Sequence, residues 1–220
     1  MVVNPVPTGE AIRYGWDRVT ERLGFWIVLI LIIGALSYLP QAIAQPFAKS
    51  APLLNLLINL AGSVISILVS IGTIAVSLKV YDGQPATYGD LVSRRHLFWR
   101  YLGATIVYTV IVMIGFVLLI VPGLIFLIKY QFALYVIVDR GVGVTEAFNA
   151  SARLTDGVKW RLFVFDVALL AVLLLGVAAL GIGLVVAWPV VLMAAAYMYR
   201  HRIAATSAAP AGMQPEPVTT

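Results

Sequence analysis

Long apolar runs alternate with short charged segments along the whole chain. Crossing the hydrocarbon core of a bilayer takes about 20 consecutive apolar residues in a helix. Six stretches meet or approach that length: Phe25 to Ala44, Leu53 to Val80, Tyr101 to Val121, Leu124 to Val138, one starting near Leu162 and one ending near Tyr199. The pattern predicts an all-α fold, a polytopic membrane helix bundle of about six transmembrane helices.

Two of the apolar blocks must fold back on themselves. The block from Tyr101 to Val138 has 38 residues, and as one helix it would be about 57 Å long. The hydrocarbon core is only about 30 Å thick. Pro122 and Gly123 lie just past the middle of the block and favour a turn. Leu162 to Tyr199 is also 38 residues long, with Gly181-Ile182-Gly183 at its middle. Each block therefore predicts a helical hairpin, the first turning at Pro122 and Gly123.

A charged segment with helical periodicity precedes each hairpin. Each segment opens with a threonine that is placed to cap a helix, followed by an acidic residue in the first turn. The pairs are Thr8 and Glu10, Thr87 and Asp90, and Thr145 and Glu146. Tryptophan and basic residues near the ends of these segments are typical of the lipid headgroup region.

The chain thus reads as one transmembrane domain, residues 1–202, built from three units at 8–81, 86–139 and 145–200. Each unit is an interfacial amphipathic helix followed by a membrane hairpin. The alternative is that no repeat exists, because loops between spans are commonly basic and aromatic in any case. Residues 203–220 are small, polar and Pro-containing, which predicts a disordered cytoplasmic tail.

Composition agrees with a membrane location. Apolar residues make up 61% of the chain and charged residues 11%, whereas a soluble domain carries about 25% charged residues. There are no cysteines, which excludes disulfides and thiolate metal sites.

The basic residues are distributed unevenly between the two sides of the predicted membrane. Thirteen of the fifteen lysines and arginines flank the spans on one side, Lys49 is on the other, and Lys129 is inside a span. Basic loops stay in the cytoplasm, so both termini are predicted to be cytoplasmic. The net charge of +5 is therefore explained by topology and by attraction to membrane lipid, and no nucleic-acid partner is predicted.

The first span has a second interpretation. Basic residues, an apolar stretch and Ala42-Ile43-Ala44 before Gln45 together resemble a cleavable signal peptide. Twenty-four residues precede the apolar stretch, however, and Glu10, Asp17 and Glu21 lie among the bases. We expect the span to be retained, while cleavage remains the alternative.

Two ionisable residues fall at membrane depth, where such residues are functional candidates by default. Lys129 and Asp166 are predicted at depths that differ by several ångströms, which a lysine side chain can cover. They form a candidate intramembrane ion pair, either a substrate or proton site or a bridge between the second and third hairpins. Separate snorkelling of the two side chains is a third possibility.

Small and polar residues form a continuous stripe along one helical face of the second span. Its members are Asn55, Asn59, Ser63, Ser66, Ser70, Thr73 and Ser77. Small residues let helices approach closely in lipid, and hydroxyls and amides bond across such contacts. The stripe is a candidate packing face, or alternatively the wall of a polar passage.

No catalytic, cofactor or metal motif is found in the sequence. His96 and His201 lie among arginines at the cytoplasmic boundary, without a partner at metal-ligand spacing. The sequence therefore predicts no enzyme activity, no catalytic residue, no metal and no cofactor.

The region from Val121 to Leu169 resembles a known family. Its motifs are Val121-Pro122-Gly123-Leu124, Lys129-Tyr130, Asp139, Glu146-Ala147, Ser151, Leu154-Thr155, Gly157, Lys159-Trp160 and Leu162-Phe163. These resemble a broad family of uncharacterised bacterial six-span membrane proteins, related to the membrane domain of some glycerophosphodiester phosphodiesterases. The resemblance implies a six-span bundle in the bacterial inner membrane. It does not imply phosphodiesterase activity, because no stretch offers the metal-binding carboxylates and histidines of the catalytic domain.

The leading functional hypothesis is a non-enzymatic scaffold or accessory component that binds lipid, other membrane proteins or a second copy of itself. The alternative is a small-molecule or ion transporter or channel, with a polar path along the second span and the Lys129/Asp166 pair.

Overall fold

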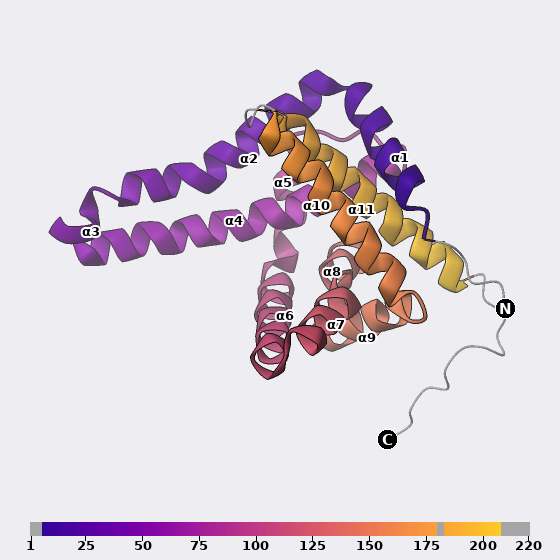
Figure 1. Cartoon of the computed structure of the whole chain (residues 1–220). Helices are drawn as coiled ribbons and strands as arrows, with labels where there is room; N and C mark the ends of the chain where they lie inside the picture. The colour runs from indigo at the N-terminus through magenta and orange to yellow at the C-terminus, as the bar shows by residue number, and fades with distance from the viewer. Residues whose placement is uncertain (1–5, 180–182, 208–220) are drawn as a thin grey trace.

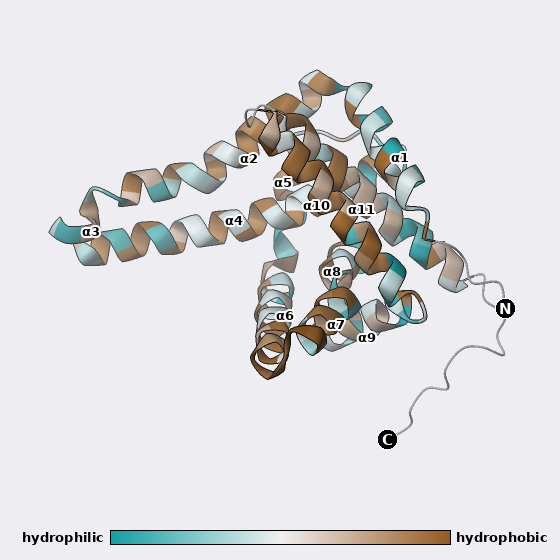
Figure 2. Cartoon of the chain, viewed as in Figure 1, coloured by the Kyte–Doolittle hydropathy of each residue, from teal (hydrophilic) through white to brown (hydrophobic). Residues whose placement is uncertain are grey.

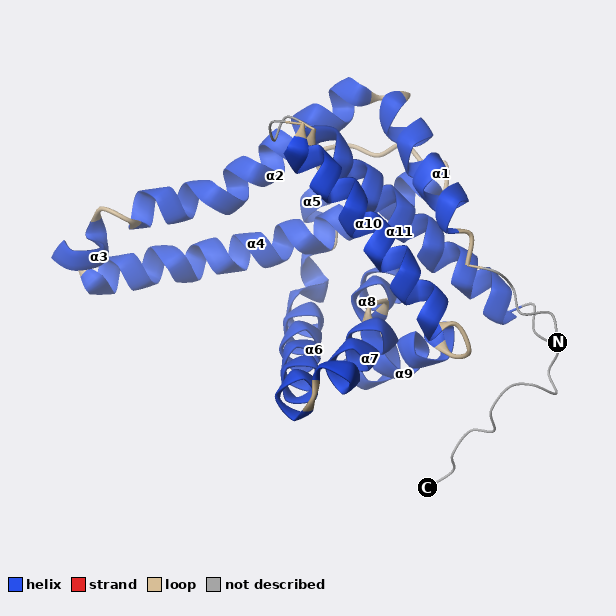
Figure 3. Ribbon diagram, in the orientation of Figure 1, coloured by secondary structure: helices blue, strands red, loops and turns tan. Residues whose placement is uncertain are grey.

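The computed structural model describes residues 6–179 and 183–207, and every regular element in these ranges is a helix (Figures 1 and 3). The helices are α1 (Thr8–Thr20), α2 (Leu23–Ala44), α3 (Phe47–Ser50), α4 (Pro52–Tyr81), α5 (Asp90–Ser93), the 3₁₀ turn η1 (Arg95–Leu97), α6 (Phe98–Leu118), α7 (Ile120–Tyr130), α8 (Ala133–Arg140), α9 (Val144–Thr155), α10 (Lys159–Ala178) and α11 (Leu184–Ser207).

Six helical segments are long and apolar enough to cross a membrane. They are Leu23–Ala44, Pro52–Tyr81, Arg95–Leu118, Ile120–Arg140, Lys159–Ala178 and Leu184–Ser207. The predicted all-α fold with six candidate spans is confirmed. Many of its large apolar side chains are exposed, as expected of helices in lipid, and Figure 2 shows hydrophobic residues along much of α7 and α10.

The hairpin of α2, α3 and α4 projects away from the remaining helices (Figure 1). Leu31, Leu39, Leu53 and Leu57 near its far end are all more than half exposed. Only the C-terminal half of α4 is deeply buried, where Ile71 and residues 74–78 join the core. We call the distal part of this hairpin, residues 30–66, the projecting arm.

The core gathers around the short helix α8. Ala133, Val136, Ile137 and Val138 of α8 have no exposed surface, and they pack with buried residues from α4, α9, α10 and α11. Because α8 continues the α7 span toward the charged side, the core lies at the end of the molecule where the charged segments meet.

Glycines mark the closest helix contacts, as small residues do in membrane proteins. A methyl group on Gly72 of α4 would lie 2.1 Å from the backbone oxygen of Leu91, and one on Gly15 of α1 would lie 2.5 Å from that of Val190 in α11. On Gly62 it would lie 2.8 Å from the Pro40 ring of α2. Helix α1 therefore packs tightly on α11, although the sequence predicted only an interfacial helix.

The turn of the second hairpin lies three residues earlier than predicted. The break is at Leu119, whose backbone is extended (φ −169°, ψ 155°), while Pro122 and Gly123 lie in the first turn of α7. Proline lacks the N–H that would bond the Leu118 carbonyl, so a helix cannot pass through it, but it fits a first turn. Gly123 serves packing, because a methyl group there would lie 2.6 Å from the Phe116 ring.

The three units are less alike than the sequence suggested. In the second unit the predicted amphipathic helix is only the four residues of α5 followed by η1. Thr8 and Thr145 lie inside α1 and α9, whose ends have no side-chain cap. Residues 203–207 of the predicted tail continue α11. The rest of that tail, and Gly181 and Ile182 of the predicted third turn, lie outside the described residues.

We predict that Gly72→Ala destabilises the protein by about 2 kcal/mol, the usual cost of overpacking, because the new methyl group meets the Leu91 backbone. Gly34→Ala, in α2, is the matched control, since nothing lies within 4 Å of its added methyl group. Thermal unfolding in detergent measures both. Equal melting temperatures for the two variants would contradict the close α4–α5 contact.

Candidate functional site at the polar base

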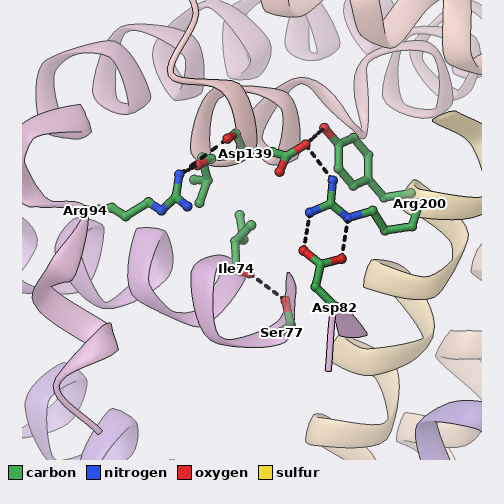
Figure 4. A network of polar contacts seen from close by, with 8 residues as sticks. Ile74, Ser77, Asp82, Arg94, Asp139 and Arg200 are labelled. Carbon is green, nitrogen blue, oxygen red and sulfur yellow. Dashed lines mark hydrogen bonds and ion pairs between the residues drawn. The ribbon is translucent and has the colours of Figure 1, made fainter. Parts of the chain in front are cut away.

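One arginine connects the three hairpins. Arg200 of α11 makes a bidentate ion pair with Asp82, which follows α4: Nη2 lies 2.6 Å from Oδ2 and Nε 3.1 Å from Oδ1. Its Nη1 lies 2.9 Å from Oδ2 of Asp139 in α8, and the Tyr199 hydroxyl donates to the same oxygen at 3.0 Å. Figure 4 shows Arg200 between the two carboxylates. All the charged groups of this triad are half-buried.

Other arginines bind the carbonyl groups at helix C-termini. Arg94 donates to the backbone oxygens of Val138 and Asp139 at the end of α8 (Figure 4). Arg100 donates to the Gly141 oxygen, and Arg202 Nε donates to the Leu154 oxygen of α9 at 2.8 Å. The last carbonyls of a helix have no intrahelical partner and carry partial negative charge. A guanidinium supplies both the hydrogen-bond donor and the positive charge that these carbonyls lack.

A further ion pair fixes the loop after α4. Lys79 Nζ lies 2.6 Å from Oδ1 of Asp90, and the Thr87 N–H donates to Oδ2 at 2.8 Å. Burial by itself raises the pKa of the Asp90 carboxyl, but hydrogen bonds from Lys79 and Thr87 outweigh it and hold this pKa below its usual value. We call Asp82, Asp139, Arg94, Arg200 and the Lys79–Asp90 pair the polar base.

The fourth span is interrupted between α7 and α8. Two α9 side chains bond the backbone at this break: the Ser151 hydroxyl donates to the Lys129 oxygen at 2.9 Å and accepts from the Phe132 N–H at 3.2 Å. The Thr155 hydroxyl lies 3.1 to 3.2 Å from three carbonyl oxygens, those of Lys129, Ser151 and Ala152, and has one proton to share among them. An unpaired backbone group at membrane depth is costly, so Ser151 stabilises the break.

Asp166 is paired, but not with Lys129. The side-chain nitrogen of Gln131, in the orientation that satisfies both groups, lies 3.1 and 3.3 Å from the carboxylate oxygens of Asp166. The Lys129 ammonium lies 5.2 Å from the centroid of the Tyr130 ring. In residues 6–179 and 183–207 no ion pair joins Lys129 to Asp166, so the structure does not bring the predicted pair together. The ammonium makes a cation–π contact instead.

The polar stripe on α4 changes character along its length. Ser63 and Ser70 are exposed, Asn55, Asn59, Ser66 and Thr73 are partly buried, and Ser77 is buried. Four of its hydroxyls bond carbonyls three or four residues earlier on the same helix, at 2.7 to 2.9 Å. The Asn55 amide donates to the Ala44 oxygen of α2 at 2.7 Å and so holds the tip of the hairpin together, while the Asn59 amide donates to Asn55.

Sequence reasoning missed two partners. Gln131 follows Lys129-Tyr130 directly, and an uncharged polar residue in an apolar stretch was the available signal. Asp82 gave no signal beyond its place in a loop. No group of three metal-ligating side chains occurs in the part of the chain that the structure describes.

These features define a polytopic α-helical membrane protein whose hairpins are joined by a charged network. Residues 46–207 match the family described as "Protein of unknown function (DUF975)". The chain belongs to this family.

Curated relatives agree at a greater distance. Uncharacterized proteins of Mycobacterium tuberculosis and Mycobacterium bovis are each 24% identical to this chain over 219 residues, which covers 87% of this chain and 67% of the relative. No solved structure matches the chain.

We predict that Arg200→Gln lowers stability by about 2 kcal/mol, because it strands both Asp82 and Asp139. The value is below the range for a fully buried pair, since the groups retain some solvent. The control is Arg13→Gln, because Arg13 is exposed and lies 3.9 Å from Asp17. Unfolding in detergent measures both, and an Arg200→Gln protein as stable as the control would refute the linking role.

A double-mutant cycle tests the intramembrane contacts. Lys129→Met and Asp166→Asn should be additive to within about 0.5 kcal/mol, because the two side chains do not meet. Gln131→Met and Asp166→Asn should couple by more than that, because each leaves the other's polar group unpaired. Unfolding in detergent measures both cycles. Coupling between Lys129 and Asp166, with additivity between Gln131 and Asp166, would support the ion pair predicted from the sequence and contradict the contact with Gln131.

Proposed function

We propose that the protein is a non-enzymatic scaffold or accessory component of the bacterial inner membrane, which binds other membrane helices through the projecting arm. The observation that carries this proposal is the small and polar stripe of α4, exposed at Ser63 and partly buried at Asn59 and Ser66, on a hairpin that extends away from the rest of the chain.

The chemistry of that face suits a helix partner better than lipid alone. Any apolar side chain can pack against lipid tails. The opposite face of α4 has such side chains, among them Leu57 and Val64. Ser63 in the arm, and Ser70 one turn beyond it, have small side chains. A second helix can therefore approach the α4 backbone closely at these positions. Their hydroxyls are already bonded to their own helix, so they add no desolvation cost when a partner covers them.

The arrangement of charge supports a membrane orientation with both termini in the cytoplasm. Lys49 is in α3 at the tip of the projecting arm, whereas the polar base gathers arginines at the other end. Basic groups are retained on the cytoplasmic side. In this orientation the arm presents its stripe within the bilayer.

The resemblance of residues 121–169 to membrane domains of some glycerophosphodiester phosphodiesterases supports an accessory role. In those proteins the chemistry belongs to a separate soluble domain. A comparable division of labour would give this chain a partner that carries the activity.

A transporter or channel is the second candidate, and one observation favours it. The fourth span is broken at membrane depth beside Asp166 and Gln131, and interrupted helices form the binding sites of many transporters. Solute flux into liposomes that contain the purified protein would establish this alternative.

Cross-linking tests the scaffold proposal, because the chain has no cysteines of its own. We predict that Ser63→Cys, carrying a photoactivatable cross-linker, forms adducts with another polypeptide in native membranes. Val64→Cys is the control, since it lies at the same depth, is 39% exposed and faces away from the stripe. Adducts of equal yield at both positions, or at neither, would contradict a specific docking face.

A further inference from the structure

A cavity of about 250 Å³ lies where the hinge between α1 and α2 meets the loop after α4. Its polar rim carries Arg18, Glu21 and Arg22, and its apolar side includes Phe25, Trp26 and Pro85. The cavity lies outside the projecting arm, and its lining residues Val80 and Gly83 flank Asp82 of the polar base.

The fold holds the walls of this cavity in place. Trp26 is 2% exposed, and its indole N–H donates to the Arg18 oxygen at 3.4 Å, which ties the start of α2 to the end of α1. The Phe25 ring stacks on Tyr88 with 5.1 Å between centroids and 19° between planes. Gly83 turns the opposite wall with φ +69°, a conformation that glycine adopts without strain.

The charges on the rim leave one net positive charge. Arg18 pairs with Glu21 at 3.0 Å. Arg22 has no ion-pair partner within the described ranges 6–179 and 183–207. A single unneutralised guanidinium beside a carboxylate matches a monoanion better than a dianion, because Glu21 repels additional negative charge.

The position of the cavity selects the kind of monoanion. It lies at the first turn of α2 and the last turn of α4, which are the ends of two candidate spans on the basic side of the chain. This is the level of the lipid headgroups, where tryptophan and arginine are favoured. Basic pockets beside membrane helices on the cytoplasmic side bind anionic headgroups.

We propose that this cavity binds the phosphodiester headgroup of an anionic phospholipid from the leaflet on the basic side. Arg22 contacts the phosphate, and Phe25 and Pro85 contact the glycerol and the first methylene groups. A free phosphate ion would carry more charge than the rim favours and would leave the apolar wall uncovered.

Lipid retention by the purified full-length protein tests this site. The protein in detergent is titrated with phosphatidylglycerol, phosphatidylcholine or inorganic phosphate, and native mass spectrometry counts the bound molecules. One phosphatidylglycerol should bind about tenfold more tightly than phosphatidylcholine, the order expected for one charge-assisted contact. Similar affinity for the two lipids, or displacement of the lipid by millimolar phosphate, would overturn the proposal.

Matched variants distinguish binding in this cavity from nonspecific attraction to a basic surface. Arg22→Gln should weaken phosphatidylglycerol binding about tenfold, whereas Arg13→Gln makes the same charge change on an exposed part of α1 and should leave it within about twofold. Ala86→Phe fills the cavity with the charges retained and should also reduce binding. Equal losses for Arg22→Gln and Arg13→Gln, or undiminished binding by a folded Ala86→Phe protein, would overturn the site. The cross-linking experiment at Ser63 tests the proposed scaffold function separately, so its outcome does not depend on whether this cavity binds lipid.

Discussion

The Arg200 guanidinium holds three membrane hairpins together at one end. It projects from the last helix and binds Asp82 beyond α4 and Asp139 in α8, so each hairpin contributes one member of the triad. A planar fork with five donors can bind one carboxylate bidentately and a second one at the same time, whereas lysine has only three donors and no planar fork. Two further arginines bond unpaired carbonyl groups at helix ends: Arg94 of the polar base at the end of α8, and Arg202 near the end of α9.

This arrangement leaves the opposite ends of the hairpins free to diverge. Within lipid no hydrophobic force draws apolar helices together, so packing needs small residues or polar contacts. Such contacts occur at Gly15, Gly72 and the Gly115–Gly123 pair, all between elements that the structure brings close. The projecting arm has Gly62 and the Asn55 amide to join α2 to α4, and beyond these its surface is apolar or small.

The sequence predicted the membrane spans, which depend on hydropathy. It could not predict side-chain pairing, which depends on how each helix is rotated about its axis. The six spans follow from apolar length alone. The pairing of Lys129 with Asp166 was inferred from depth, but depth does not say which way a side chain points, and Gln131, in the turn after Tyr130, lies beside Asp166 instead. The turn at Leu119 was misplaced for a related reason. Proline forbids the helix that would precede it, so the break falls before Pro122 and not at it.

The break between α7 and α8 links the membrane span to the polar base. After the break at Tyr130, α8 buries four of its eight residues in the core and carries Asp139 to Arg200. The Lys129 oxygen accepts a hydrogen bond from Ser151 of α9, and Arg202 of α11 donates to the Leu154 oxygen near the end of the same helix. Ser151 and Arg202 therefore hold α9 at two places, the break in the fourth span and the last helix α11.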